Sequence, residues 1–112
     1  MNIDKLYWHD GVLDDVQFAP RERSRDGFTF IMRASLYPTP EDRQRQPYKF
    51  TFAGNGLLSL SCDFHELRMN RGAGNISYAY AKEQSGRRVF WLHLVDGHVT
   101  FKFKSVKIEK LS

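Results

Sequence analysis

Hydrophobic and polar positions alternate with a period of two residues along most of the chain. This alternation is typical of β-strands that bury one face and expose the other. The alternating segments are also rich in aromatic and β-branched residues, which fit a pleated, half-buried surface. The predicted strands lie near residues 16–18, 28–37, 48–54, 57–62, 76–81, 89–95 and 98–104.

Short turn sequences separate the later strands. Asn55-Gly56 predicts a tight hairpin between strands 48–54 and 57–62, because Asn-Gly readily adopts the positive φ angles of such a turn. Asp96-Gly97 predicts a second hairpin on the same grounds, and Ser85-Gly86 predicts a third.

One segment has helical character. Asp63 is followed three residues later by Glu66, a spacing that resembles a capping box and predicts a short helix near 63–70. The fold class is therefore mainly β, with one short helix in a single domain, 1–112. About seven strands form an antiparallel meander, as an open barrel or a two-layer sandwich.

The last strand changes its inward parity. Phe101 and Phe103 are odd-numbered, whereas Val106 and Ile108 are even-numbered. A bulge or bend near Ser105 is needed if all four face the core.

The Asp96-Gly97 turn fixes a register for the last hairpin. It places Leu92 opposite Phe101, Trp91 opposite Lys102 and His93 opposite Thr100. One face is then entirely apolar and is the predicted core: Phe90, Leu92, Leu94, Val99, Phe101 and Phe103. A turn at Ser85-Gly86 extends the pairing to the preceding strand and places Tyr80 opposite Trp91 and Tyr78 opposite His93.

The opposite face of these three strands is the candidate binding site. It consists of Tyr78, Tyr80, Trp91, His93, Lys102 and Lys104, and Thr100 lies on the same face. Aromatic rings beside lysines can stack nucleic-acid bases and neutralise phosphates, or they can line a ligand pocket. Alternatively, Lys102 and Trp91 form an ordinary cross-strand pair, and the short helix or the N-terminal strand covers the remaining residues.

Composition narrows the class of protein. The chain has 112 residues, a net charge of +4 and one cysteine, so no internal disulfide can form. The charged N-terminus does not resemble a signal peptide, and no apolar run is long enough for a membrane span. We expect a soluble, cytoplasmic protein that does not bind membranes. Arginines gather in the connecting segments, as solvated loops or as a surface for phosphate or an acidic partner.

The residues that could carry chemistry do not assemble into a recognisable site. Four histidines and one cysteine do not give the paired ligands of a zinc site, and we expect no metal and no cofactor. Cys62 shares an apolar strand face and is interpreted as a buried side chain. His9-Asp10 precedes Gly11 and is interpreted as the turn that opens the first strand, with Tyr7 or Trp8 anchored in the core. No catalytic residues are predicted, and we expect no enzymatic activity.

Scattered positions resemble a group of known families. Trp8-His9-Asp10 precedes the first strand, Phe52-Ala53-Gly54 ends a later one, and Asn70 and Gly74-Asn75-Ile76 precede another. This pattern is similar to small, uncharacterised, β-rich bacterial families, some of which are grouped with immunity proteins of polymorphic toxin systems. The resemblance implies a non-enzymatic protein that binds another protein. The chain departs from it in charge, because immunity proteins against nuclease toxins tend to be acidic.

Two functions follow from these patterns. The first is a non-catalytic binding module for another protein, with an immunity-type protein as its narrower form. The alternative is binding of RNA or single-stranded nucleic acid through the Tyr/Trp/Lys face and the arginine-containing loops.

Overall fold

A computed structural model describes residues 3–20, 27–62, 75–84 and 87–111. They form a short 3-10 turn, η1 (Ile3–Lys5), and six antiparallel strands. The strands are β1 (Val12–Pro20), β2 (Gly27–Leu36), β3 (Gln46–Cys62), β4 (Ile76–Gln84), β5 (Arg87–Leu94) and β6 (Gly97–Lys110). The mainly β, antiparallel prediction is confirmed. The helix predicted near 63–70 lies outside the described residues.

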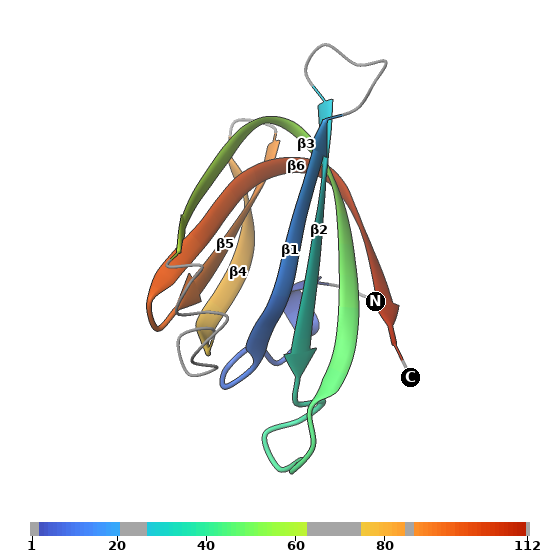
Figure 1. The fold of residues 1–112 in the computed structure, drawn as a ribbon, viewed down its shortest axis with the longest axis vertical. Coiled ribbons are helices and arrows are strands. Elements are labelled where there is room, and N and C mark those ends of the chain that lie inside the picture. The colour runs from blue at the N-terminus through green and yellow to red at the C-terminus, as the bar shows by residue number, and fades with distance from the viewer. Residues whose placement is uncertain (1–2, 21–26, 63–74, 85–86, 112) are drawn as a thin grey trace.

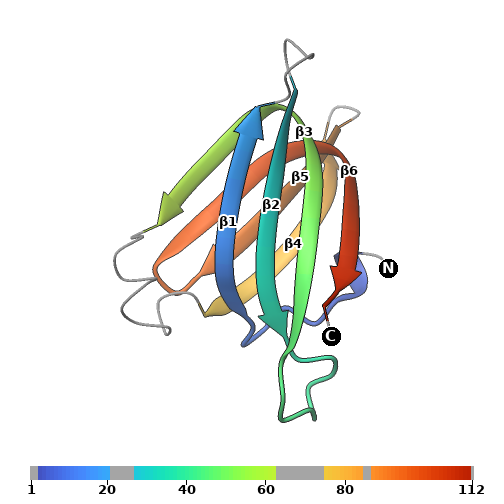
Figure 2. The same cartoon turned by 45° about the vertical axis from the view of Figure 1, so that its right-hand side comes forward.

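The six strands form one curled sheet in the order β1-β2-β3-β6-β5-β4. It is built from two three-stranded meanders, which are joined where β3 pairs with β6. These two long strands bend over one end of the molecule, so that the two meanders face each other as an open half-barrel (Figures 1 and 2). A single sheet thus supplies both walls of the core.

The hairpin predicted at Asn55-Gly56 is wrong, and the two strands that it was to join are one strand, β3. The register explains the difference. Gly54 pairs with Phe103 and Leu58 with Phe101, so three residues of β3 lie opposite one residue of β6. Pairing with β6 continues on both sides, and the turn-forming residues are absorbed as an irregularity within the strand. The described sheet therefore has six strands rather than seven.

The bulge predicted near Ser105 is confirmed. Ser105 pairs with Ala53 and Phe103 pairs with Gly54, which leaves Lys104 as one extra residue in β6. The extra residue reverses the inward parity of the strand. As a result Phe101 and Phe103 are buried, and Val106 and Ile108 also pack against the core.

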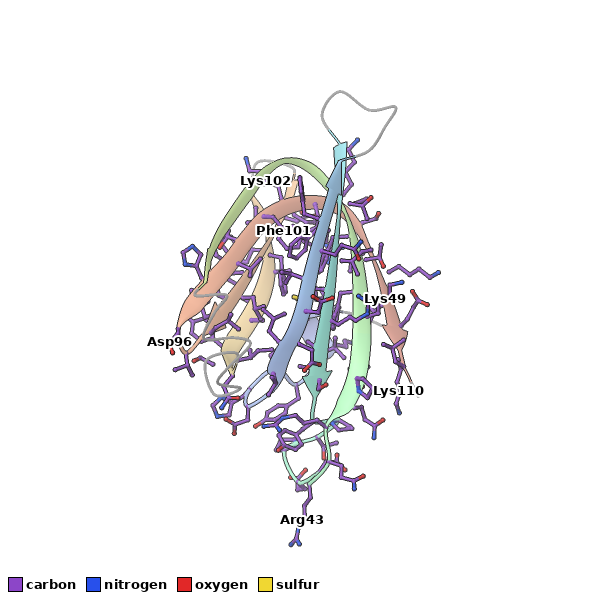
Figure 3. The ribbon with its side chains drawn as sticks, viewed as in Figure 1. Arg43, Lys49, Asp96, Phe101, Lys102 and Lys110 are labelled. Carbon is purple, nitrogen blue, oxygen red and sulfur yellow. The ribbon has the colours of Figure 1, made fainter. Side chains whose placement is uncertain are left out.

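The core lies on the concave side of the sheet and is rich in aromatic rings. Phe101 points into it, whereas its neighbour Lys102 points outward (Figure 3). The predicted core face of β5 and β6 is confirmed, since all six of its residues are buried. Phe52 and Phe101 meet edge to face at a centroid distance of 4.6 Å, a favoured aromatic geometry.

The N-terminal segment packs against the concave side. Trp8 is buried, with its ring 5.1 Å from that of Phe50 and 5.5 Å from that of Phe90. Its indole Nε1 donates a hydrogen bond to the carbonyl of Ile3 at 3.1 Å. Trp8, rather than the half-buried Tyr7, is therefore the anchor of this segment.

Candidate binding site

The β5–β6 turn lies one residue earlier than predicted. Its central residues are Val95 and Asp96, and Leu94 pairs with Gly97. Moving a turn by one residue changes the pairing by two residues, so every side chain keeps its predicted face. Among the described non-glycine residues only Asp10 has a positive φ. The turn therefore does not place Asp96 in the left-handed conformation that an Asp-Gly hairpin requires.

The shifted register changes the cross-strand neighbours. Trp91 lies opposite Thr100, not Lys102, and His93 lies opposite His98, not Thr100. The prediction that Trp91 and Lys102 form a cross-strand pair is therefore wrong, because Lys102 lies opposite Val89. The β4–β5 register is confirmed: Tyr78 pairs with His93 and Tyr80 with Trp91.

These pairings place nine side chains in three rows on the outer face of β4, β5 and β6, here called the aromatic grid. The rows are Tyr78–His93–His98, Tyr80–Trp91–Thr100 and Lys82–Val89–Lys102. Five of the six predicted site residues belong to it. The sixth, Lys104, is the extra residue of the β6 bulge and lies beyond the last row.

Lys82 was not among the predicted site residues. The period of two residues nevertheless places it on the same strand face as Tyr80, so the sequence does indicate its position. Alternation by two from Thr100 likewise places His98 on this face, and the shifted turn sets it opposite His93, which the sequence alone does not indicate.

Four of the five rings of the grid, those of Tyr78, Tyr80, Trp91 and His93, are nearly parallel and stack across β4 and β5. The ring of Tyr78 lies 4.2 Å from that of His93, with 22° between their planes. Tyr80 and Trp91 are 4.9 Å apart at 23°. Both separations are close to the ~4.8 Å spacing of paired strands, so the rings stand on edge with their flat faces turned toward one another. The edges of the rings, not their faces, are presented outward.

The grid is partly open to solvent. Tyr78 is 51% exposed, although Val89 on the same face is only 3% exposed. The Lys82 ammonium lies 5.6 Å from the centroid of the Tyr80 ring, within the range of a cation–π contact. The grid holds two lysines and no aspartate or glutamate. The Nε2 atom of His93 is buried and has no hydrogen-bond partner among the described residues.

The N-terminal strand β1 does not cover the grid, because it pairs with β2 at the other end of the sheet order. The described residues that precede β1 do not cover it either. Trp8 packs on the opposite side of the sheet. At the free edge of β4, the carboxylate of Asp4 accepts a hydrogen bond from the backbone N–H of Ala81 at 3.3 Å. The other predicted cover, the helix near 63–70, lies outside the described residues.

His9 and Asp10 form the turn before β1, as predicted. Asp10 has a φ of 64°, and Gly11 N–H donates to the Trp8 carbonyl at 3.0 Å. The His9 ring contacts the Ser77 carbonyl through Nδ1 at 3.0 Å, and its Nε2 lies 3.5 Å from the Asp10 carboxylate. Both side chains are more than 60% exposed. The pair links the start of β1 to the start of β4.

Two arginines of the connecting segments, Arg45 and Arg88, contact their own chain. Arg45 lies 4.8 Å above the Tyr37 ring and donates through Nε to the Asp10 carbonyl. The Arg88 guanidinium lies 4.8 Å from the centroid of the Phe103 ring. Arg45 and Arg88 thus have structural contacts outside the grid.

Within the described ranges, no three His, Cys, Asp or Glu side chains are grouped as metal ligands. None of the helices in the described part of the chain has the length and apolar character needed to cross a membrane. The side chain of Cys62 lies outside the described residues.

Comparisons with protein-family models, with curated proteins and with solved structures found no match to this chain.

Proposed function

We propose that the protein is a non-catalytic binding module that recognises another protein through the aromatic grid. The observation that carries the proposal is the pair of edge-on ring stacks on an outer sheet face, with Tyr78 half exposed. Tyrosine and tryptophan are enriched among residues that dominate protein–protein binding energy. Stacking fixes these rings before binding, so little side-chain entropy remains to be lost on association.

The size of the grid suits the centre of an interface. Three rows and three strands cover roughly 20 Å by 14 Å. A standard interface buries about 800 Å² on each partner. The grid would thus supply the central contacts, and surrounding residues would supply the rim.

Binding of RNA or single-stranded nucleic acid is the second candidate, and the lysines of the grid favour it. Base stacking, however, needs flat ring faces that are open to solvent. In each stack one ring face is already covered by a neighbouring ring. The other faces of Tyr78 and Tyr80 are turned away from β5, and Lys82 already lies over the Tyr80 ring. The other faces of His93 and Trp91 are turned toward β6, where His98 and Thr100 lie opposite them. The ring geometry therefore supports a protein partner over a nucleic acid.

The resemblance to immunity-protein families adds a narrower hypothesis, in which the partner is a toxin. Under that hypothesis the module would act by occupying the toxin surface, with no catalytic step of its own.

Affinity capture with matched variants tests the proposal. Tagged wild-type protein, Tyr78→Ala and Gln17→Ala would be used to capture proteins from cells that produce the chain. Gln17 is exposed on the outer face of β1 and serves as the control. We expect one protein to be captured by the wild type and by Gln17→Ala, and to be depleted at least tenfold with Tyr78→Ala. Equal capture by all three proteins would contradict binding through the grid, and recovery of RNA alone would favour the second candidate.

A further inference from the structure

The charged residues around the grid indicate what kind of protein surface it fits. Lys82 and Lys102 lie at the two ends of one row, on either side of Val89. With two strand spacings between them, their Cα atoms are separated by roughly 10 Å. Val89 is 3% exposed, in a position that the aliphatic stems of lysines can cover while their ammonium groups remain in water.

The outer face formed by β1, β2, β3 and the second half of β6 has a different charge pattern. Arg33 lies 3.4 Å from the Asp15 carboxylate, and Lys107 lies 3.9 Å from that of Glu109. Arg33 and Lys107 are therefore paired with acids there. Among the described residues neither Lys82 nor Lys102 is in an ion pair, and the grid itself contains no acid, so the grid carries a net positive charge. The Asp4 carboxylate, at the edge of β4, bonds to the backbone of Ala81.

We infer that the grid docks an acidic protein surface, whose carboxylates meet the Lys82–Val89–Lys102 row while its apolar groups meet the ring edges. The inference rests on the proposed function and names the chemistry of the partner. A second copy of this chain is disfavoured, because both faces would carry the same positive charge and like charges oppose association. An acidic surface would also be attracted from a distance, which raises the association rate at low salt.

A charged probe tests this inference without knowledge of the partner. Fluorescent polyglutamate would be titrated with the wild type, with Lys82→Ala/Lys102→Ala, and with Lys49→Ala/Lys107→Ala at about 20 mM salt, where screening is weak. The control pair loses the same charge from the outer face of β3 and β6, where Glu109 pairs with Lys49 and ion-pairs with Lys107. We expect the grid pair to weaken binding by roughly threefold to tenfold, the scale of two exposed ion pairs. The control pair should stay within about twofold.

Several results would overturn the inference. Equal weakening by both double variants would mean that polyglutamate senses only net charge. Absence of wild-type binding would remove the acidic surface as the ligand. Tighter binding of a polyuridine of matched charge, lost on Trp91→Ala, would assign the face to nucleic acid. A wild-type dimer in sedimentation that Tyr78→Ala dissociates would make a second copy the occupant.

These outcomes are separate from failure of the proposed function. Capture of a protein that depends on Tyr78 but not on Lys82 or Lys102 would keep the binding module and discard its preference for acidic surfaces. Polyglutamate binding through the grid lysines, with no Tyr78-dependent capture, would do the reverse.

Discussion

The two meanders of the sheet bury similar inner faces but present different outer faces. In β1, β2 and β3, outward positions carry mixed polar residues, including the Asp15–Arg33 ion pair and the hydrogen bond from Ser35 to Asp14 at 2.6 Å. In β4, β5 and the first half of β6, they carry stacked rings and two lysines without an acid among them. Burial constrains every second residue in both meanders. The other residues are free to differ, and there the two meanders diverge in chemistry.

The largest expected effect comes from the core, which both meanders share. Phe101 is fully buried and contacts the rings of Phe30, Phe52 and Phe90. Phe101→Ala should lower the free energy of unfolding by about 3 to 5 kcal/mol, through lost burial and a cavity. Chemical denaturation measures this change. Lys102→Ala, the next residue outward, should change it by less than about 0.5 kcal/mol. Similar costs for both variants would mean that the faces of β6 are assigned wrongly.

A smaller effect is expected where the free edges of the two meanders meet. The Gly11 carbonyl accepts a hydrogen bond from Ile76 N–H at 2.7 Å, beside the bridge between Val12 and Asn75. A Cβ at Gly11 would lie 2.5 Å from Leu36 Cδ2 and 3.1 Å from two backbone oxygens. Gly11→Ala should therefore destabilise by about 1 to 3 kcal/mol, the usual cost of overpacking. Thermal unfolding measures it.

The neighbouring residue provides the control for Gly11→Ala. Asp10 already has the positive φ that glycine adopts without strain. Asp10→Gly should change stability by less than about 1 kcal/mol. A larger loss with Asp10→Gly than with Gly11→Ala would show that the His9–Asp10 contact, and not close packing, holds this junction.

The ring stacks should make a measurable but modest contribution to stability. A double-mutant cycle on Tyr80→Ala and Trp91→Ala should give a coupling energy of about 0.5 to 1.5 kcal/mol, as expected for an aromatic pair. A cycle on Gln17→Ala and Ile31→Ala, a cross-strand pair on the other outer face, should give a smaller value. Equal couplings would remove the distinction between the two outer faces.

The smallest effect is expected at the Asp15–Arg33 ion pair. The two side chains are 58% and 39% exposed, and surface pairs of this kind contribute about 0 to 1 kcal/mol. Arg33→Ala should lower stability by less than that amount, and the loss should shrink as salt screens the pair. Partner capture should not change. Reduced capture with Arg33→Ala would extend the binding site to the first meander.

Alternation by two residues was sufficient to assign inner and outer faces. It placed Phe101 and Leu92 inward and Tyr80 and Trp91 outward, and each assignment survived the displaced β5–β6 turn because the shift was even. Local turn chemistry was less reliable. Asn55-Gly56 favours a hairpin in isolation, but pairing with β6 on both sides holds the chain in one strand.

The detailed geometry of the grid could not be predicted from the sequence. Register depends on the location of the turn, so Thr100 and not Lys102 became the neighbour of Trp91. Ring orientation depends on side-chain rotamers, which the alternation does not specify. The rings therefore could be placed on one face from the sequence, but their edge-on stacking could not be predicted.

Site-specific photo-crosslinking tests the central claim most directly, namely that the aromatic grid is the surface that binds a protein. The crosslinking residue p-benzoylphenylalanine would replace Tyr78 in one variant and Gln17, on the outer face of β1, in another. After irradiation of cells that produce each variant, denaturing gels would show adducts of the chain with other proteins. We predict one discrete protein adduct from position 78 and none from position 17. An adduct from position 17 alone, equal adducts from both positions, or no adduct from either would contradict the claim.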